Sequence, residues 1–287
     1  MRLGIVGGSG LYQMAAVEDG ELVDFETPWG APSDSLLLGR IGDVPVAFLP
    51  RHGRGHRLSP SELNYRANVA ALKMAGCTHV LSISACGSFR EELPPGTFVL
   101  VDQYVDRTRD RPRSFFGDGI VAHVSMAQPA CNTFGNVCEE TLKALDMQHA
   151  RGGNYLVMEG PQFSTRAESL LYRAGVLDVI GMTAMPEAAL AREAELCYQT
   201  VAMVTDFDAW HDAHEAVDVA QVLEVIHRNV ANAKALIVAV AGRLTAQGGA
   251  CGSGCTTALQ HAVITERAAW PAETLARLSV VAGRVLK

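Results

Sequence analysis

The sequence lacks several features that define whole classes of protein. Aromatic residues make up only 6% of the 287-residue chain. No segment approaches the roughly 18 consecutive apolar residues that indicate a membrane-spanning helix. The first residues, Met1–Val6, run directly into a strand-like segment without the apolar stretch and cleavage site of a secretory signal. The sequence therefore predicts a cytoplasmic protein with no membrane partner.

Excess positive charge and a disulfide framework are lacking as well. The chain has 24 Lys and Arg against 31 Asp and Glu, a formal net charge of -7. This balance disfavours nucleic acid and anionic membranes as partners, because both carry phosphates. A small anionic substrate would need a local cationic pocket. The seven cysteines are odd in number and spread along the chain, which indicates reduced thiols.

The pattern of apolar residues predicts the fold class. Short β-branched runs alternate with helical stretches, which favours an α/β fold: a single domain with a mixed, largely parallel central β-sheet flanked by helices. Strands are expected at Leu3–Val6, Val46–Leu49, Val80–Ser84, Phe98–Val101, Tyr155–Met158, Val179–Ile180 and Thr200–Val204. Helices are expected from Ser59 to Gly76, from Arg166 to before Gly175, over Val219–Val240 up to Gly242, and around Pro271–Leu286. We divide the chain into a domain over 1–244 and a C-terminal extension over 245–287 that packs on the same domain.

Two glycine-rich loops that follow predicted strands suit an anion. The first, Gly-Gly-Ser-Gly at 7–10, allows close approach of backbone N–H groups and adds the Ser9 hydroxyl. It is not a dinucleotide fingerprint, because Gln13 stands where a glycine is needed, and no Walker lysine follows. The second, Arg-His-Gly-Arg-Gly-His at 51–56, offers arginine forks that match phosphate oxygens. The alternatives are a tight turn for the first loop and a solvated basic loop for the second.

Three further segments follow strands, at 84–88, 159–164 and 181–187. In the first, Cys86 has no partner histidine at a telling spacing, which favours a buried thiol over a nucleophile. In the second, Phe163 either stacks on a base or fills the core, and Ser164 either caps the next helix or binds the ligand. The third favours a plain loop before a helix that starts at Pro186.

Two carboxylates, Asp206 and Asp208, come directly after the predicted strand Thr200–Val204. Residues at i and i+2 point the same way if the extended conformation persists. As acceptors they suit an exocyclic amine, and a protonated member can donate a proton to a leaving base. The alternative is a pair of turn or helix-cap aspartates.

Taken in order, these segments resemble the purine nucleoside phosphorylase superfamily, specifically its trimeric 5'-methylthioadenosine phosphorylase branch. The resemblance runs from Gly4 to about Val240 and includes Asn-Tyr-Arg-Ala-Asn at 64–68 besides the motifs above. It implies an enzyme, a pentosyltransferase, that cleaves a nucleoside with inorganic phosphate as co-substrate. It implies no organic cofactor and no metal, and a homotrimer with shared active sites.

The resemblance also assigns roles to residues of this chain. Phosphate would be held by Ser9, Arg51, His52, Ser84, Ala85 (through its backbone) and Thr183. Met182 would lie under the ribose and bond to it through its backbone. The purine would face Phe163, Ser164, Asp206 and Asp208. The 5' pocket would be lined by Val219, Val222 and Leu223, with His123 supplied by a neighbouring subunit.

The residue types at these positions favour one substrate. Superfamily members that act on 6-oxopurines carry Asn near the base, whereas Asp206 and Asp208 suit the 6-amino group of adenine. Asp206 would assist the leaving base at N7. The three aliphatic positions favour a methylthio group at the 5' carbon, and 5'-deoxyadenosine also fits. The alternatives are a 6-oxopurine nucleoside or methylthioinosine phosphorylase and, from another class, a non-catalytic nucleoside-binding protein.

Two features depart from the family pattern. Gly181 stands where some relatives carry Asn. Cys251 and Cys255, separated by three residues, suit a local disulfide, half of a metal site, or neither. We expect free thiols or a labile disulfide and no metal, because two ligands without a nearby pair rarely hold one, although His261 offers a third.

Overall fold

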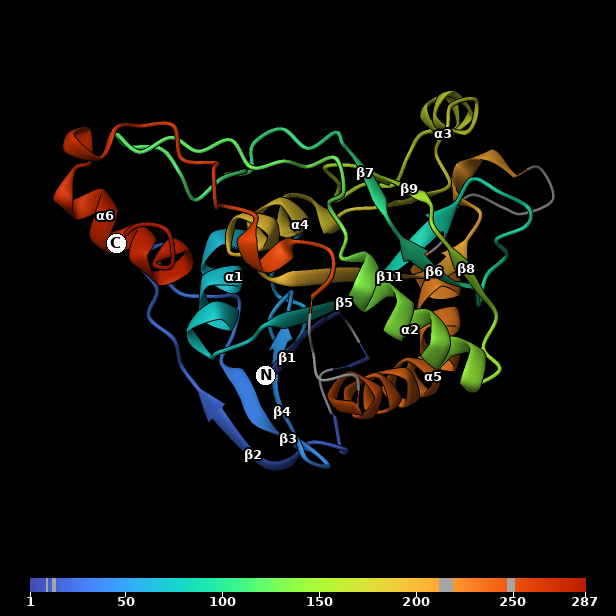
Figure 1. The fold of residues 1–287 in the computed structure, drawn as a ribbon. Coiled ribbons are helices and arrows are strands. Elements are labelled where there is room, and N and C mark those ends of the chain that lie inside the picture. The colour runs from blue at the N-terminus through green and yellow to red at the C-terminus, as the bar shows by residue number, and fades with distance from the viewer. Residues whose placement is uncertain (9, 12–13, 212–218, 247–250) are drawn as a thin grey trace.

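The computed structural model describes residues 1–8, 10–11, 14–211, 219–246 and 251–287; within 219–246 it describes the side chains at 225, 227 and 229–244. In this part of the chain, eleven strands form one mixed sheet with helices on both faces (Figure 1). The predicted α/β class is confirmed. None of the helices described is both long and apolar enough to cross a membrane.

The strands follow the order β2-β3-β4-β1-β5-β10-β9-β7, and β11 pairs with β5 and with β6, which in turn pairs with β8. Their bounds are β1 Leu3–Gly7, β2 Glu18–Val23, β3 Leu36–Ile41, β4 Val44–Pro50, β5 His79–Ser88, β6 Phe98–Val101, β7 Gln103–Asp106, β8 His149–Arg151, β9 Asn154–Val157, β10 Val179–Gly181 and β11 Cys197–Asp206. The neighbours β4, β1, β5 and β11 run parallel, so their carboxyl ends lie at the same edge of the sheet. This is the edge where open α/β sheets bind ligands.

The helices cover the two faces of the sheet (Figure 1). Their bounds are α1 Tyr65–Met74, α2 Asn132–Ala144, α3 Arg166–Arg173, α4 Ala184–Glu193, α5 Val219–Ala246 and α6 Ala272–Ala282. Ile5 of β1 packs in one core cluster with Phe134 of α2 and Leu236 of α5. Val6, the next residue, packs in the other cluster with Leu190 of α4 and Leu278 of α6. Successive side chains of a strand point to opposite faces, so β1 contributes to both cores.

The first helix begins later than expected. Helix α1 starts at Tyr65, and its N-cap is Asn64, whose side chain accepts a hydrogen bond from the N–H of Ala67 at 3.1 Å. The Ser59 hydroxyl donates to a Glu62 carboxylate oxygen at 2.6 Å. A capping box needs that hydroxyl to accept from the backbone instead. Residues 59–62 therefore form a turn, which borders the cavity described below.

Three other helix boundaries show what the sequence pattern missed. Helix α5 passes through Gly242 to Ala246, because buried neighbours such as Leu244 hold it against the sheet. Helix α3 is capped by Thr165, not by Ser164, in a capping box with Glu168. Helix α2 was not predicted. Its N-cap is Cys131, and cysteine is not one of the residue types that indicate a helix start.

Candidate active site

A cavity of about 800 Å³ opens at the edge where the parallel strands end. Each of these strands delivers a lining segment to it: Gly8 after β1, Arg51 after β4, Ser84 to Gly87 within β5, and Asp206 at the end of β11. Thr183 at the start of α4 and two α5 residues, Val230 and Ala233, complete the wall. The fold therefore gathers most of the motifs singled out in the sequence around one cavity.

The Arg51 guanidinium is buried and held on several sides. It donates to both carboxylate oxygens of Glu187, from Nε at 2.9 Å and from Nη2 at 3.2 Å. It also donates to Ser82 Oγ at 2.6 Å and to the Ile83 carbonyl at 3.1 Å. These bonds engage four of the five guanidinium N–H groups, and among the described residues the fifth has no partner and is left for a ligand. Burial alone would raise the pKa of Glu187, but Arg51 holds it below its usual range.

His52 presents a hydrogen-bond acceptor. Burial, together with the charge of Arg51, lowers the pKa of His52 to about 4, so the ring is neutral near pH 7. Its Nδ1 lies 2.8 Å from the Leu58 carbonyl, which only accepts, so the ring proton is on Nδ1. The Nε2 atom is then an acceptor. His56 stacks on this ring with 4.3 Å between the centroids.

Thr183, Ser84 and Ala85 are the remaining residues expected at the phosphate. The Thr183 hydroxyl makes no capping hydrogen bond. The backbone is non-helical at Met185, so the regular part of α4 begins at Pro186, where the sequence predicted a helix start. Ser84 and Ala85 also line the cavity. Ser9 lies outside the described residues.

Asp206 is a buried carboxylate that lines the cavity and has a raised pKa. Burial raises its pKa to about 6. Thr205 Oγ1 donates to Asp206 Oδ2 at 2.7 Å, and the Asp208 N–H donates to Oδ1 at 2.8 Å. Gly87 of β5 permits this close packing, because a Cβ there would lie 2.9 Å from Asp206 Oδ1.

The extended conformation ends at Asp206. Asp206 and Asp208 were expected to point the same way only if the strand continued through both residues, and it does not. Asp208 has a positive φ of 52° and begins a 3-10 turn, η1 (Asp208–Trp210). Both carboxylates nevertheless line the cavity. Burial raises the pKa of the Asp208 carboxyl, and hydrogen bonds from Ser169, the Ala209 N–H and Ser164 offset part of this shift.

Of the residues expected at the purine and at the 5' pocket, some line the cavity and others do not. Phe163 lines the cavity with 41% of its surface exposed, whereas Ser164 is buried and does not line it. His123 lies in an exposed segment, where its N–H donates to the Ala262 carbonyl at 2.9 Å, away from this chain's own cavity. The side chains of Val219, Val222 and Leu223 lie outside those described.

Arg111 is a positioning residue that the sequence did not reveal. It is 5% exposed, and its Nη1 donates to the carbonyls of Met182 at 2.6 Å and Met185 at 2.9 Å. Its Nη2 donates to the Glu159 carbonyl at 2.8 Å. Arg111 thus connects two loops at the cavity through hydrogen bonds. Because the Met182 carbonyl accepts from Arg111, the Met182 N–H is the backbone group of this residue that can bond to a ribose. In the sequence, Arg111 is one of several arginines in a charged segment, and nothing distinguishes it.

Gly181 is required by its neighbour Tyr155. A Cβ at position 181 would lie 1.9 Å from Tyr155 Oη, which itself lies 3.4 Å from Ser84 Oγ. The Asn of some relatives therefore does not fit beside this tyrosine. Cys86 is 4% exposed, and burial raises the pKa of its thiol well above the usual value, so it is a buried thiol, as expected, and not a nucleophile.

Comparison with known proteins identifies the class to which this fold and cavity belong. The family model of the phosphorylase superfamily matches residues 2–241. This range contains every strand of the sheet and every residue described here at the cavity.

The relatives narrow the assignment. The chain is 53% identical to the S-methyl-5'-thioadenosine phosphorylase of Cereibacter sphaeroides over 99% of its own length and 98% of the relative's. The chain is also 47% identical to the S-methyl-5'-thioadenosine phosphorylase of Geobacter sulfurreducens, and the match covers 98% of each chain. The solved structure of a methylthioadenosine phosphorylase from an antarctic soil metagenomic library superposes with a TM-score of 0.91 at 45% identity, covering 97% of this chain and 98% of that one. The chain belongs to the methylthioadenosine phosphorylase family, which confirms the resemblance noted from its motifs.

A further solved structure was obtained with a bound base. The methylthioadenosine phosphorylase of Schistosoma mansoni, in complex with adenine, has a TM-score of 0.83 and 38% identity, and the match covers 86% of this chain and 92% of that one.

Proposed function

We propose that the protein cleaves 5'-methylthioadenosine with inorganic phosphate, giving adenine and 5-methylthioribose 1-phosphate. The observation that carries this proposal is the arrangement of the cavity. Buried Arg51, neutral His52 and Thr183 border it together with two carboxylates of raised pKa, Asp206 and Asp208. The relatives named for this reaction match nearly the whole chain.

The bonds of the reaction balance without an additional reactant. The bond between the anomeric carbon and N9 of adenine breaks, and its electron pair leaves with the base. A phosphate oxygen forms the new bond to the anomeric carbon, and the proton that the base gains at N7 comes from Asp206. The sugar phosphate monoanion then loses its proton, which restores the protonated Asp206. No organic cofactor enters this scheme, and phosphate is a co-substrate.

The phosphate site supplies charge and hydrogen bonds of both kinds. Arg51 contributes a permanent positive charge and one remaining N–H donor. His52 Nε2 accepts from the hydroxyl that phosphate carries near neutral pH. The Thr183 hydroxyl adds a donor. A phosphate fixed in this way stabilises the positive charge that develops on the ribose and is positioned to attack it.

Asp206 and Asp208 have different proposed tasks. Asp206, with a pKa raised to about 6, holds a proton for part of the time near neutral pH and stabilises the negative charge that builds on the base. The Asp208 carboxylate, which lines the cavity, accepts from the 6-amino group of adenine. A 6-oxopurine would place a carbonyl oxygen against this acceptor and leave both without a donor.

The proposal for the 5' substituent rests on helix α5. Its described cavity residues, Val230 and Ala233, are apolar. The side chains of Val219, Val222 and Leu223 lie outside those described, and they remain the proposed wall around a methylthio group on the basis of the family resemblance.

A panel of nucleosides tests the proposal. We expect release of adenine from 5'-methylthioadenosine only when phosphate is present, slower or equal release from 5'-deoxyadenosine, and at least about tenfold lower kcat/KM for methylthioinosine, a difference that an unpaired buried polar group explains. The measurement is base release followed by chromatography, with and without phosphate. Faster turnover of the hypoxanthine nucleoside would assign a 6-oxopurine phosphorylase. Binding without a phosphate-dependent product would assign a nucleoside-binding protein.

We also propose a cytoplasmic homotrimer with shared active sites. The exposed position of His123, away from its own chain's cavity, suits a role at a neighbour's cavity. The seven cysteines are free thiols in this structure, which suits a reducing compartment. Light scattering on the purified protein should give three times the chain mass, and His123→Ala should raise KM for the nucleoside more than it lowers the rate at saturation. A fully active monomer would refute the shared site.

A further inference from the structure

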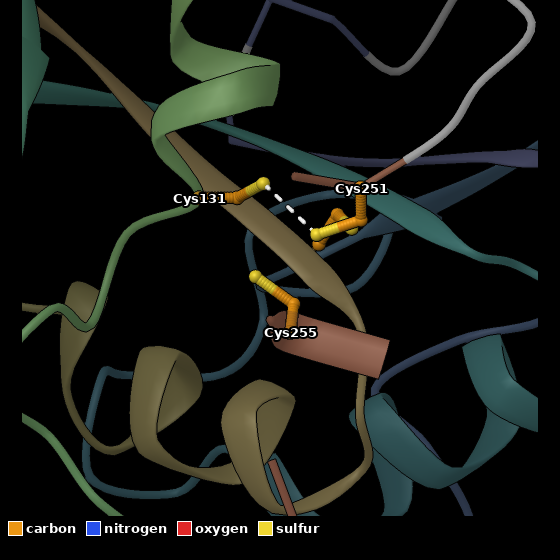
Figure 2. Close-up of side chains that lie close together, drawn as sticks. Cys131, Cys251 and Cys255 are labelled. Carbon is orange, nitrogen blue, oxygen red and sulfur yellow. Dashed lines mark hydrogen bonds between the residues drawn. The ribbon is translucent and has the colours of Figure 1, made fainter. Parts of the chain in front are cut away.

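Four cysteines from three separate parts of the sequence converge beside the start of helix α2. Their Sγ atoms, from Cys131, Cys197, Cys251 and Cys255, all lie within 4.8 Å of one another. Figure 2 shows Cys131 at the beginning of α2 pointing toward Cys251, with their sulfurs 3.9 Å apart, and Cys255 beside them. We propose that these four thiolates form a structural site for a divalent thiophilic cation, zinc, which fastens the C-terminal segment to the sheet.

The distances match a tetrahedral metal site. Zinc–sulfur bonds of about 2.3 Å place the four sulfurs of a tetrahedron about 3.8 Å apart. The Cys131–Cys251 distance of 3.9 Å agrees with this value. A disulfide requires about 2.0 Å, so the sulfurs are not arranged for a bond between them. The upper bound of 4.8 Å for the whole set leaves only a small contraction for a cation to bring about.

The tertiary structure reveals a second pair of cysteine ligands that the sequence did not indicate. We expected no metal, because Cys251 and Cys255 showed no nearby pair of ligands. The pair is Cys131, the N-cap of α2, and Cys197, the first residue of β11. His261, the third ligand considered from the sequence, is not a member of the cluster that the described residues form.

Three of the four cysteines are shielded from solvent. Cys131, Cys197 and Cys255 are exposed by 2% or less, and Cys251 is partly exposed. Thiolates of this kind exclude water from a closed, four-coordinate site, which is the pattern of structural zinc rather than catalytic zinc. The partly exposed Cys251 leaves a route for the cation to enter.

The surroundings favour negative charge at the sulfurs. Four thiolates around Zn²⁺ carry a net charge of about -2, which hydrogen-bond donors and cations must offset. The Phe134 N–H donates to Cys131 Sγ at 3.4 Å, at the positive end of the α2 dipole. The Arg192 guanidinium donates to Cys255 Sγ at 3.3 Å.

The loop that carries two of the ligands is itself fixed to α2. The Thr133 N–H donates to Ser253 Oγ at 2.9 Å, and the Gly252 N–H donates to Thr133 Oγ1 at 3.1 Å. These bonds place residues 251–255 against the first turn of α2 without any contribution from the sulfurs. The site is therefore pre-organised by polar contacts that are independent of the cation.

The proposed site is remote from the reaction. Cys197 is the first residue of β11 and Asp206 is the last. At about 3.3 Å per residue, nine steps along a strand span roughly 30 Å. The cation would stabilise the attachment of the segment that follows α5, including α6, and would not touch substrate.

Metal analysis of the whole protein tests this proposal. The chain is produced with Zn²⁺ in the medium, purified under reducing conditions, and its metal content is measured by plasma mass spectrometry. We expect about one zinc per chain in the wild type and less than about a tenth of that in Cys251→Ala and Cys255→Ala. Cys77→Ala and Cys138→Ala, which change buried free cysteines outside the cluster, should retain the metal.

Cobalt substitution and chelation test the site in the wild-type protein, so the proposal can be judged even if a variant fails to fold. Wild-type protein reloaded with Co²⁺ should show the visible bands of tetrahedral cobalt and sulfur-to-cobalt charge transfer, and Cys255→Ala should not. A strong chelator should lower the Tm of the wild type and leave that of Cys251→Ala unchanged. Wild-type protein that takes up neither Zn²⁺ nor Co²⁺, equal metal loss in the control variants, or a disulfide among the four cysteines in the protein as purified would overturn the proposal.

Discussion

The Asp206→Asn enzyme should release adenine from 5'-methylthioadenosine at least about tenfold more slowly than the wild type, because a positioned proton donor contributes at least this much. Asparagine keeps the size of the side chain and its place beside Thr205 and Gly87, and it can still donate a hydrogen bond to N7. It has no proton to transfer. The measurement is kcat at saturating phosphate and nucleoside. A near wild-type rate would remove Asp206 from the mechanism.

The pH profile distinguishes a proton donor from a residue that only shapes the cavity. Burial raises the pKa of Asp206 to about 6, so its acid form is present below that pH and is lost as the pH rises through it. The wild-type kcat/KM should therefore fall on the alkaline side of pH 6, and this limb should be absent from Asp206→Asn. Asp208→Asn is the matched control. It should keep the limb and weaken the preference for adenine nucleosides.

The second large effect concerns stability. Glu187→Gln should lower the free energy of unfolding by about 3 kcal/mol, because it removes the charge that balances buried Arg51. Arg51 is 1% exposed and cannot turn to solvent. Urea unfolding measures the loss, and the KM for phosphate should rise with it, because Glu187 orients the guanidinium. A variant as stable as the wild type at neutral pH would show that other contacts hold Arg51.

The dependence on pH follows from the direction of the pKa shift. Arg51 holds the pKa of Glu187 below its unfolded value, so this contribution to stability is present at neutral pH and is lost as the pH falls. The difference between wild type and Glu187→Gln should narrow on acidification. Glu193 offers a control, because its hydrogen-bond partners in the described part of the chain are Ser114 and the Phe115 N–H and neither of them is cationic. Burial raises its pKa to about 7, so its contribution is lost as the pH rises, and Glu193→Gln should show no narrowing in acid.

The sequence predicted the strands of the parallel sheet well because their signal is local. Runs such as Phe98–Val101 are apolar on both faces and need no partner to be recognised. The strands it missed, such as β2 and β8, are exposed or only three residues long, so neither has a buried face to produce a pattern. The start of α1 was predicted too early because Ser59 and Glu62 have the residue types of a capping box but bond to each other.

The cavity residues likewise divide into those that a local pattern indicates and those that depend on contacts between distant parts of the chain. The sequence identified Arg51, His52 and the two aspartates because each follows a strand of the sheet directly. It did not identify Glu187 or Arg111, since their partners, at Arg51 and at Met182, are distant in the chain.

By itself, the sequence determined the α/β class, the family and the chemistry of the loops that follow the strands, because strand patterns and strand–loop motifs are short-range features. Only the tertiary structure decided which charges are paired, which carboxyl groups titrate near neutral pH, and which cysteines meet. A pKa shift depends on burial and on neighbours from other elements. The four sulfurs, likewise, are brought within 4.8 Å by the sheet, α2 and the loop after α5 together.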